Sequence, residues 1–224
     1  MSFQAGQYIN LLIPGVEGTR AFSIANNPSL ANELELHVRL VEGGAGTGWI
    51  YQEMKVGDKL TVSGPYGQFF VRKSDGGGAI FIAGGSGLSS PQSMILDLLV
   101  SEDPRPMYLF QGARNLGELY NRSLFEQLDQ QHDNFHYIPV LSAPEADDDW
   151  QGLTGYVHDA ANQYFDGKLR GNKAYLCGPP PMIDAAITTL MQGRVFERDI
   201  HMEKFVTAAD GAGDGERSAL FKRI

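Results

Sequence analysis

The chain has 224 residues, of which 42% are hydrophobic and 20% charged, and these proportions are typical of a globular protein. Its 27 acidic residues outnumber its 18 basic residues, and the resulting net charge of -9 argues against nucleic acid as a partner. A single cysteine excludes an intramolecular disulfide, a cysteine-only zinc site and a four-cysteine iron–sulfur cluster held by these residues.

Neither a leader segment nor a membrane anchor is expected. Residues 1–4 include no basic region followed by an apolar stretch, and the longest apolar runs, such as residues 79–83, are too short to span a bilayer. We therefore expect a soluble, cytoplasmic protein without membrane contact. The acidic run at residues 145–149 contains no histidine and is more often a solvated turn than a metal site, so we expect no bound metal.

The first third of the chain has the pattern of β-strands. Residues 33–40 alternate apolar and polar side chains, which predicts a strand with one buried face. The pattern predicts further strands at residues 8–13, 20–25 and 59–63, and a short helix at residues 47–54. Because Pro-Gly and Asn-Asn-Pro turns separate these strands, we expect a small antiparallel β-barrel, which forms a first domain over residues 1–74.

After the glycine-rich loop at residues 74–78, short apolar strands alternate with helices. Strands are expected at residues 79–83, 106–111, 135–141, 173–177 and 199–205. Helices are expected at residues 91–101, 116–131, 155–165 and 180–192. This order predicts an α/β domain over residues 75–224, a doubly wound parallel sheet whose ligands bind beyond the carboxyl ends of the strands.

The loop Gly84-Gly85-Ser86-Gly87-Leu88 lies at such a place, between an apolar strand and a helix. Free backbone amides at a helix N-terminus suit a pyrophosphate, and glycine permits its close approach. The dinucleotide fingerprint requires a third glycine where this chain has Ser90, so a tight turn without a ligand is the alternative.

Two further motifs lie in the first domain. Arg20-Ala21-Phe22-Ser23 offers a forked donor for phosphate, an aromatic ring for a flat heterocycle and a hydroxyl for a ring nitrogen. Its alternative is an exposed arginine beside a core phenylalanine. Residues 43–49 form a glycine-rich turn that leads into a helix, and this turn is either a phosphate site or a plain loop.

The fourth motif is Cys177-Gly178-Pro179-Pro180-Pro181-Met182, at the end of a strand of the parallel sheet. A lone buried cysteine is usually inert, and no neighbouring basic residue in the sequence predicts a lowered pKa for this thiol. Its place at the carboxyl end of a strand makes it a candidate site residue.

In this order the four motifs resemble those of the ferredoxin–NADP reductase superfamily, which joins a flavin-binding barrel to a nicotinamide-binding α/β domain. Residues 3–12, 64–70, 82–96 and 196–224 resemble more closely the reductase components of multicomponent phenol hydroxylases and related bacterial diiron monooxygenases. The resemblance implies a flavoprotein that passes a hydride from NADH to FAD. A [2Fe–2S] ferredoxin domain or protein, and then an oxygenase component that hydroxylates an aromatic compound, would receive the electrons.

The resemblance also implies residue roles. The FAD site would comprise Arg20, Ala21, Phe22, Ser23, His37, Val38, Arg39, Gly44, Gly46 and Thr47. Arg20 would hold the pyrophosphate, Phe22 would pack on the isoalloxazine and Ser23 would act near N5 as a catalytic residue. For His37 alone, a solvent-facing position on a strand is an equal alternative.

The NADH site would comprise Gly85, Ser86, Gly87, Leu88, Gln111, Arg114, Cys177, Gly178, Pro179 and Met182. Cys177 would be the second catalytic residue, facing the nicotinamide. Gln111 and Arg114 would meet the adenosine ribose, and an arginine there would also suit the 2′-phosphate of NADPH. Phe205 would lie near the flavin, with a place in the core as its alternative.

The sequence departs from the reductase pattern in two respects. It lacks the cysteine ligands of a [2Fe–2S] domain, and residues 3–8 resemble a stretch already inside the flavin barrel, so the first barrel strand is expected to be missing. Two alternatives therefore remain open. The chain could be a truncated, non-catalytic nucleotide-binding fragment, or a flavin reductase that serves a dioxygenase, a globin or a separate ferredoxin.

Overall fold

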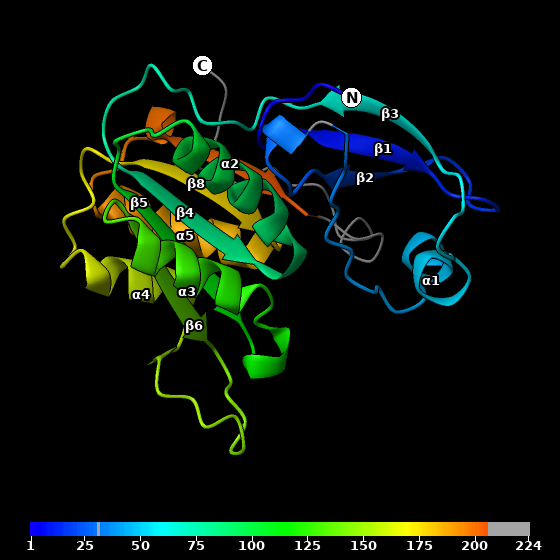
Figure 1. Cartoon of the computed structure of the whole chain (residues 1–224). Helices are drawn as coiled ribbons and strands as arrows, with labels where there is room; N and C mark the ends of the chain where they lie inside the picture. The colour runs from blue at the N-terminus through cyan, green and yellow to red at the C-terminus, as the bar shows by residue number, and fades with distance from the viewer. Residues whose placement is uncertain (31, 206–224) are drawn as a thin grey trace.

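The computed structural model describes residues 1–30 and 32–205, which form two β-sheets side by side (Figure 1). An antiparallel sheet has the strand order β2-β1-β3, and a parallel sheet has the order β7-β6-β5-β4-β8-β9. The expected fold class, an antiparallel β unit followed by a doubly wound α/β unit, is confirmed. Within the described residues, the expected barrel is represented by the three-stranded sheet.

In the small sheet, β1 (Tyr8–Leu12) pairs on one side with β2 (Thr19–Ser23) and on the other with β3 (Thr61–Tyr66). Ile9 and Leu11 are buried, whereas the neighbouring Leu12 is 49% exposed, as expected for a strand with one covered face. The unit also contains the 3-10 turn η1 (Pro28–Leu30) and helix α1 (Ala45–Gln52).

The strand predicted at residues 33–40 is wrong. Only Leu36 forms a bridge, to Ile24, and the amide of Ala25 donates to the carbonyl of Glu35 at 2.9 Å. A strand needs a continuous partner, and this segment meets its neighbour at one point only. The apolar alternation has another cause, since Leu34 and Leu36 are partly buried against a small core around Ile24.

The parallel sheet lies between two layers of helices. Its strands are β4 (Ala79–Gly84), β5 (Met107–Ala113), β6 (Phe135–Leu141), β7 (Leu153–Thr154), β8 (Lys173–Gly178) and β9 (Ile200–Lys204). Every residue of β4 is buried. A strand covered on both faces is expected to be apolar throughout, which is why this segment is recognisable in the sequence.

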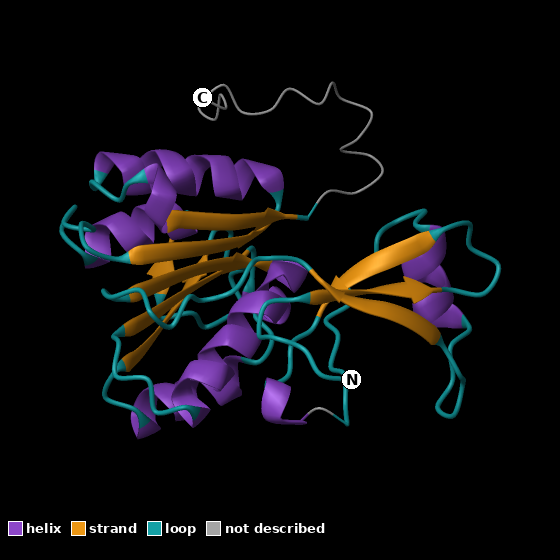
Figure 2. Ribbon diagram, turned by 90° about the horizontal axis from the view of Figure 1, so that it is seen from above, coloured by secondary structure: helices purple, strands orange, loops and turns teal. Residues whose placement is uncertain are grey.

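Helices cover both faces of this sheet (Figure 2). On one face, α2 (Ser89–Val100) and α3 (Arg122–Gln131) pack against Phe81. On the other, α4 (Val157–Tyr164) and α5 (Pro180–Gln192) pack against Ile80 and Ile82. Over residues 1–30 and 32–205, none of the helices has the length and hydropathy needed to span a bilayer.

Two details of the α/β unit differ from the expectation. The helix predicted at residues 116–131 is divided into the 3-10 turn η3 (Leu116–Glu118) and α3. Asn121 separates them with a φ of 57°, a left-handed conformation that asparagine tolerates better than most residues. The two-residue strand β7 was not predicted, because so short an element leaves no periodic signal.

The two units are joined by hydrogen bonds from α2 to the segment that follows β2. The hydroxyl of Ser93 donates to the carbonyl of Asn26 at 2.7 Å, and the side-chain amide of Asn27 donates to the carbonyl of Leu96 at 2.9 Å. Ser93, Asn26 and Asn27 are buried. These bonds fix the small sheet relative to the parallel sheet, because buried polar groups are costly to leave without partners.

Candidate functional site

The carboxyl ends of β4 and β8 meet because the two strands are adjacent and parallel, with Ala83 opposite Cys177. β5 lies on the other side of β4, so the sheet order reverses here, and open α/β sheets bind ligands at such a point. A Cβ added to Gly87 would lie 2.4 Å from the carbonyl oxygen of Cys177. Glycine is therefore required at position 87, and the loop at residues 84–88 lies directly against Cys177.

The residues after Cys177 make equally close contacts with this loop. A Cβ on Gly84 would lie 2.6 Å from the sulfur of Met182, and a Cβ on Gly178 would lie 2.8 Å from the terminal carbon of Met182. Pro179 precedes α5 as its N-cap. The structure thus brings together two motifs that lie far apart in the sequence, Gly85–Leu88 and residues 177–182.

A polar cluster lies beside these loops, centred on Glu203 of β9. Its Oε2 accepts hydrogen bonds from the hydroxyls of Ser23 and Ser90, each at 3.2 Å, and lies 3.9 Å from the sulfur of Cys177. Ser23 comes from β2 of the small sheet, whereas the other three belong to the α/β unit. The two predicted catalytic residues, Ser23 and Cys177, are therefore both neighbours of one carboxyl group.

Burial controls the protonation of this cluster. It raises the pKa of the Glu203 carboxyl. The hydrogen bonds from Ser23 and Ser90 lower this pKa, but their effect is smaller than that of burial. Burial, and after it the Glu203 carboxylate, raises the pKa of the Cys177 thiol well above its ordinary value. Cys177 is 0% exposed. Near neutral pH it is therefore a neutral thiol and not a thiolate nucleophile.

Sequence reasoning missed Glu203 and Ser90. Ser90 was considered only as the residue that replaces a third glycine, yet its hydroxyl holds the Glu203 carboxyl. Glu203 carries no local motif, and a glutamate at the end of an expected strand is unremarkable in isolation. Its place on the strand adjacent to Cys177 was the available signal, since Cys177 and Glu203 are paired in the β8–β9 register.

The two predicted phosphate motifs of the small unit also meet. Arg20 on β2 and Gly46 in α1 are in contact, since a Cβ on Gly46 would lie 3.1 Å from Cγ of Arg20. Arg20 is exposed, and one of its Nη atoms donates to the carbonyls of Glu17 and Thr19 at 3.1 and 3.0 Å. An exposed guanidinium beside a glycine-rich helix start is a suitable arrangement for a phosphate group.

The other residues of these motifs lie close by. A Cβ on Gly44 would meet the hydroxyl of Thr47 at 3.0 Å, and that hydroxyl accepts a hydrogen bond from the amide of Val41 at 3.0 Å. Ala21 is exposed and Phe22 is half-buried, next to the buried Ser23. Residues 20–23 thus run from an exposed arginine to the buried cluster around Glu203.

The predicted segment His37, Val38 and Arg39 spans two environments. The carbonyl of Val38 accepts a hydrogen bond from the hydroxyl of Tyr51 at 2.9 Å. Arg39 forms an ion pair with Glu118, and one of its Nη atoms lies 3.2 Å from the position of a Cβ on Gly85. The guanidinium of Arg39 therefore lies over the loop at residues 84–88, although the resemblance implied a place in the flavin site.

Gln111 and Arg114 lie in different environments, Gln111 in the interior and Arg114 on the surface. Gln111 is 2% exposed; its amide nitrogen donates to the carbonyl of Tyr120 at 3.0 Å and its oxygen accepts from the hydroxyl of Tyr137 at 2.6 Å. Because both ends of its side chain are engaged in the interior, Gln111 is a structural residue in this conformation and does not offer a group to a ribose. Arg114 is exposed and forms an ion pair with Glu118.

Phe205 is the last residue that the structure describes. Its amide donates to the carbonyl of Gly178 at 2.9 Å, and its ring packs against the core of the α/β unit. The contact with Gly178 places Phe205 beside the predicted site. Its packing agrees with the alternative prediction, a place in the core. Residues 206–224, the rest of the segment that carries the resemblance, lie outside the described residues.

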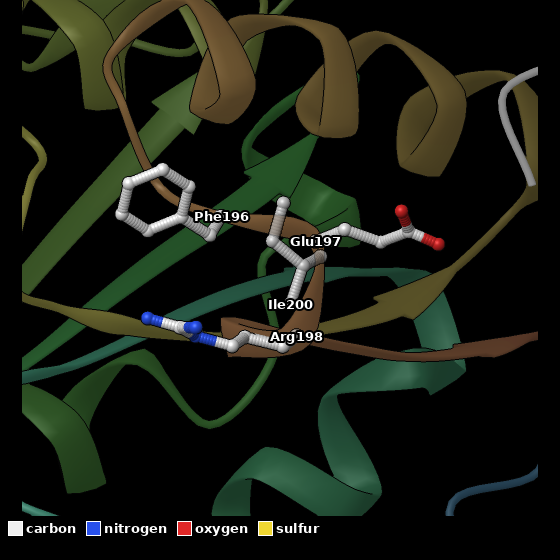
Figure 3. A pocket seen from close by; sticks show the side chains of 4 residues that line it. All are labelled: Phe196, Glu197, Arg198 and Ile200. Atoms are coloured by element: carbon white, nitrogen blue, oxygen red, sulfur yellow. The ribbon is translucent and has the colours of Figure 1, made fainter.

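A surface hollow lies elsewhere in the described part of the chain. It has a volume of about 720 Å³ and is lined by Phe196, Glu197, Arg198 and Ile200 (Figure 3). These residues precede or begin β9, so they lie at the amino ends of the parallel strands, whereas Cys177 and the loop at residues 84–88 lie at the carboxyl ends. We place the candidate site at the motifs and not at this hollow, because ligands of such sheets bind at the carboxyl ends of the strands.

Comparison with known proteins gives two domain families in chain order. Residues 1–71 match the oxidoreductase FAD-binding domain, and residues 81–188 match the oxidoreductase NAD-binding domain.

Curated relatives match over the whole chain. The reductase component of phenol 2-monooxygenase, DmpP, from Pseudomonas sp. strain CF600 is 69% identical over 224 residues, and the phenol hydroxylase P5 protein of Acinetobacter pittii strain PHEA-2 is 65% identical. In both cases the match covers 100% of this chain and 64% of the relative. The chain thus spans slightly less than two thirds of these relatives.

Two solved structures with a similar fold are also named as reductases. The crystal structure of the Amycolatopsis cytochrome P450 reductase GcoB superposes with a TM-score of 0.83 at 34% identity, over 92% of this chain and 62% of that one. The ferredoxin reductase of carbazole 1,9a-dioxygenase superposes with a TM-score of 0.81 at 27% identity, over 92% of this chain and 61% of that one.

Proposed function

The chain belongs to the ferredoxin–NADP reductase superfamily, and from this membership we propose that it is an NADH-dependent flavoprotein reductase that transfers a hydride from NADH to FAD. In this proposal residues 1–74 form the FAD-binding domain and residues 75–224 the NAD-binding domain. The electrons then pass to a [2Fe–2S] centre in a ferredoxin domain or protein, and on to the oxygenase component of a phenol hydroxylase-type monooxygenase.

One observation carries this proposal, namely that a single polar cluster is built from both units. Ser23 of the small sheet and Cys177 of the parallel sheet each contact the same atom of Glu203. A hydride transfer requires the flavin N5 and the nicotinamide C4 to meet, so residues of the two binding units must converge. Such convergence is expected of a reductase and has no obvious role in a fragment that binds one nucleotide.

The donor groups on the surface fit the two cofactors. Arg20 beside Gly46 and Thr47 offers a guanidinium and a helix start to the FAD phosphates. Gly85–Leu88, which runs into α2, offers the first amides of a helix to the NADH pyrophosphate, with Arg39 above it. An arginine from the flavin side would then bind a coenzyme phosphate, in addition to the roles implied by the resemblance.

The flavin supplies the redox chemistry when it is bound, accepting a hydride and releasing electrons singly. The protein residues bind, orient and exclude water. Because the Cys177 thiol is buried and stays neutral, it would not act as a nucleophile towards a nicotinamide bound beside it. Glu203 has a raised pKa and can hold a proton on Oε2, next to the hydroxyls of Ser23 and Ser90.

The proposed acceptor rests on two relatives, which are named as the reductase component of phenol 2-monooxygenase and as the P5 protein of phenol hydroxylase. The 224 residues contain one cysteine, so a cluster with four thiolate ligands must be held by other residues or by another protein. This chain would therefore deliver electrons and would not contact the aromatic substrate.

The test is a spectroscopic titration. The purified chain is reconstituted with FAD and mixed anaerobically with NADH and, separately, with NADPH. Bleaching of the flavin bands by NADH at much lower concentration than by NADPH is the expected result. A protein that binds NAD⁺ but retains no flavin would overturn the proposal and support the non-catalytic fragment, whereas equal bleaching by NADPH would overturn the coenzyme assignment.

A further inference from the structure

A chain of polar side chains connects the coenzyme loop with the segment at residues 35–39. The hydroxyl of Tyr120 lies 3.0 Å from the carbonyl oxygen of Gly85 and 3.0 Å from Nδ1 of His37. The other ring nitrogen of His37, Nε2, lies 3.0 Å from Oε1 of Glu35. The rings of His37 and Tyr120 meet edge to face, with centroids 5.0 Å apart. The His37 side chain is only 9% exposed, whereas the side chain of Glu35 is 48% exposed.

Both ends of this chain are fixed to rigid parts of the molecule. The carbonyl of Tyr120 accepts a hydrogen bond from Gln111, which is itself held by Tyr137 of β6. Oε1 of Glu35 accepts a hydrogen bond from Gln92 of α2 at 3.1 Å. A group held at both ends in this way keeps its position when its neighbours move.

The carbonyl of Gly85 matters because of the geometry of the peptide bond. In a planar trans peptide, the carbonyl of one residue and the amide N–H of the next point in opposite directions. Holding the oxygen of Gly85 at the Tyr120 hydroxyl therefore aims the N–H of Ser86 away from Tyr120. Gly85 has a φ of 55°, a left-handed conformation, at the point where β4 ends at Gly84 and the 3-10 turn at Gly85–Leu88 begins.

The number of protons limits how these contacts can be made together. Tyr120 has one hydroxyl proton, and when it donates to Gly85, His37 must donate from Nδ1 to the tyrosine oxygen. The Glu35 carboxylate only accepts, so Nε2 must donate as well. All three contacts coexist only when both nitrogens of His37 carry protons. The charged or titratable groups facing His37 are Glu35 and Arg39 on its own segment and Tyr120 on the α/β unit, where Glu118 pairs with Arg39.

We propose that Tyr120 and His37 are positioning residues that orient the coenzyme-binding loop through the carbonyl of Gly85 and fix this loop to the flavin side of the molecule. The proposal rests on the function proposed above, because it assigns the loop to the NADH pyrophosphate. Neither side chain touches a reacting atom. Their contribution is a preformed loop, and a preformed loop lowers the entropy lost on coenzyme binding.

The test uses Tyr120→Phe, which removes the hydroxyl and keeps the ring. Binding of NAD⁺ to the FAD-loaded protein is measured by calorimetry, because NAD⁺ does not reduce the flavin. Loss of one hydrogen bond to the loop should weaken NAD⁺ binding by roughly 3- to 10-fold and raise the KM for NADH similarly, with little change in kcat at saturation. Tyr164→Phe removes a hydroxyl from the far side of the same unit and should have no effect on binding.

His37 supplies a second test. In His37→Asn the side-chain amide can occupy the place of Nδ1 and keep the contact with Tyr120, whereas His37→Ala loses it. We expect His37→Asn to bind NAD⁺ more tightly than His37→Ala.

The outcomes separate this proposal from the proposed function. If the unmodified protein does not bind NAD⁺, the proposed function fails. If the unmodified protein binds NAD⁺ and the folded Tyr120→Phe protein binds it equally well, the loop-positioning role is overturned while the reductase assignment stands. Should Tyr120→Phe not fold, as judged by circular dichroism, equal binding by His37→Asn and His37→Ala would overturn the proposal.

Discussion

Glu203 is the residue on which the candidate site converges, because its carboxyl group is shared by serines of both units. Hydrogen bonds from Ser23 and Ser90 partly offset the cost of burying it, and the raised pKa records the remaining cost. A carboxyl group with these properties can carry a proton at a pH where an exposed glutamate is ionised. Glu203 is therefore both a structural link and a candidate proton carrier.

Glu203→Gln should change how stability depends on pH. The folded pKa of Glu203 is raised, so its contribution to stability is fully present below the ordinary carboxyl pKa and is lost as pH rises through the folded pKa. The glutamine of the variant cannot ionise, so the variant does not lose this stability as pH rises. The free energy of unfolding of the unmodified protein should therefore fall, relative to that of the variant, by at most about 1.4 kcal/mol per pH unit.

Urea unfolding of both proteins between about pH 4 and pH 8 measures this difference. Glu197→Gln is the matched control, since Glu197 is exposed and remote from the serines. A difference in free energy of unfolding between Glu203→Gln and the unmodified protein that does not vary with pH would contradict the role assigned to burial.

Arg20→Ala should weaken FAD retention. Arg20 is exposed beside Gly46, so its loss should not disturb the core, whereas it removes the proposed charge-assisted bonds to a phosphate. Bonds to charged groups are worth about 1.5 to 3 kcal/mol, which corresponds to roughly a 10- to 100-fold rise in the Kd for FAD. Fluorescence titration with FAD checks this, with Arg170→Ala as an exposed arginine outside the site; equal retention would remove Arg20 from the site.

At the scale of elements, the glycines of the loop at residues 84–88 are explained by the approach of β8. Parallel pairing of β4 and β8 brings Gly87 within van der Waals distance of the backbone of Cys177 and Gly178. Ser90, where the dinucleotide fingerprint has glycine, is tolerated because its hydroxyl has a partner in Glu203. The departure from the fingerprint therefore reflects a specific contact of this site.

Gly87→Ala should damage the α/β unit. The added Cβ would lie 2.4 Å from a carbonyl oxygen that belongs to a central strand and cannot move freely. Overpacking of this kind costs about 1 to 3 kcal/mol, and NAD⁺ binding should be lost as the loop is displaced. Chemical unfolding and calorimetry with NAD⁺ measure both effects. Gly76→Ala is the control, since nothing lies within 4 Å of a Cβ there; similar behaviour of the two variants would refute the packing argument.

At the scale of the whole molecule, hydride transfer requires the two units to keep a fixed relation. The buried bonds between α2 and Asn26 and Asn27 form that connection. The cluster at Glu203 and the contacts of Tyr120 lie on other parts of the same interface. The interface therefore combines buried hydrogen bonds with apolar packing, since Ala5, Phe69 and Val71 belong to the buried apolar cluster of the α/β unit.

Ser93→Ala should loosen this interface. It removes a 2.7 Å hydrogen bond and leaves the carbonyl of Asn26 without this buried donor, at a cost of about 1 to 3 kcal/mol. The rate of flavin reduction by NADH, measured by stopped flow, should fall while FAD content stays unchanged, because orientation is lost before binding. Ser142→Ala removes an exposed hydroxyl and should change neither quantity. A reduction rate equal to that of the unmodified protein would show that the bond does not set the orientation.

Much of the fold was predictable from local patterns. The strands of the parallel sheet are short apolar runs because they are covered on both faces, and the predicted bounds of β6 and α5 agree with the structure. The strand predicted at residues 33–40 was wrong because apolar–polar alternation indicates a half-buried segment but does not indicate whether a partner strand lies beside it. Asn121 interrupts the predicted helix for a conformational reason that hydrophobic periodicity does not contain.

The sequence by itself determined the two-unit architecture and the motifs at Arg20, Gly85 and Cys177, because hydrophobic periodicity and glycine spacing are properties of neighbouring residues. Only the tertiary structure decided that Glu203 joins Ser23 and Cys177, that Gln111 is turned inward, and that His37 reaches Tyr120. The contacts of Ser23 with Glu203 and of His37 with Tyr120 pair residues that are 180 and 83 positions apart in the chain. Their meeting depends on strand order and on how the two units dock, and neither is encoded in any local pattern.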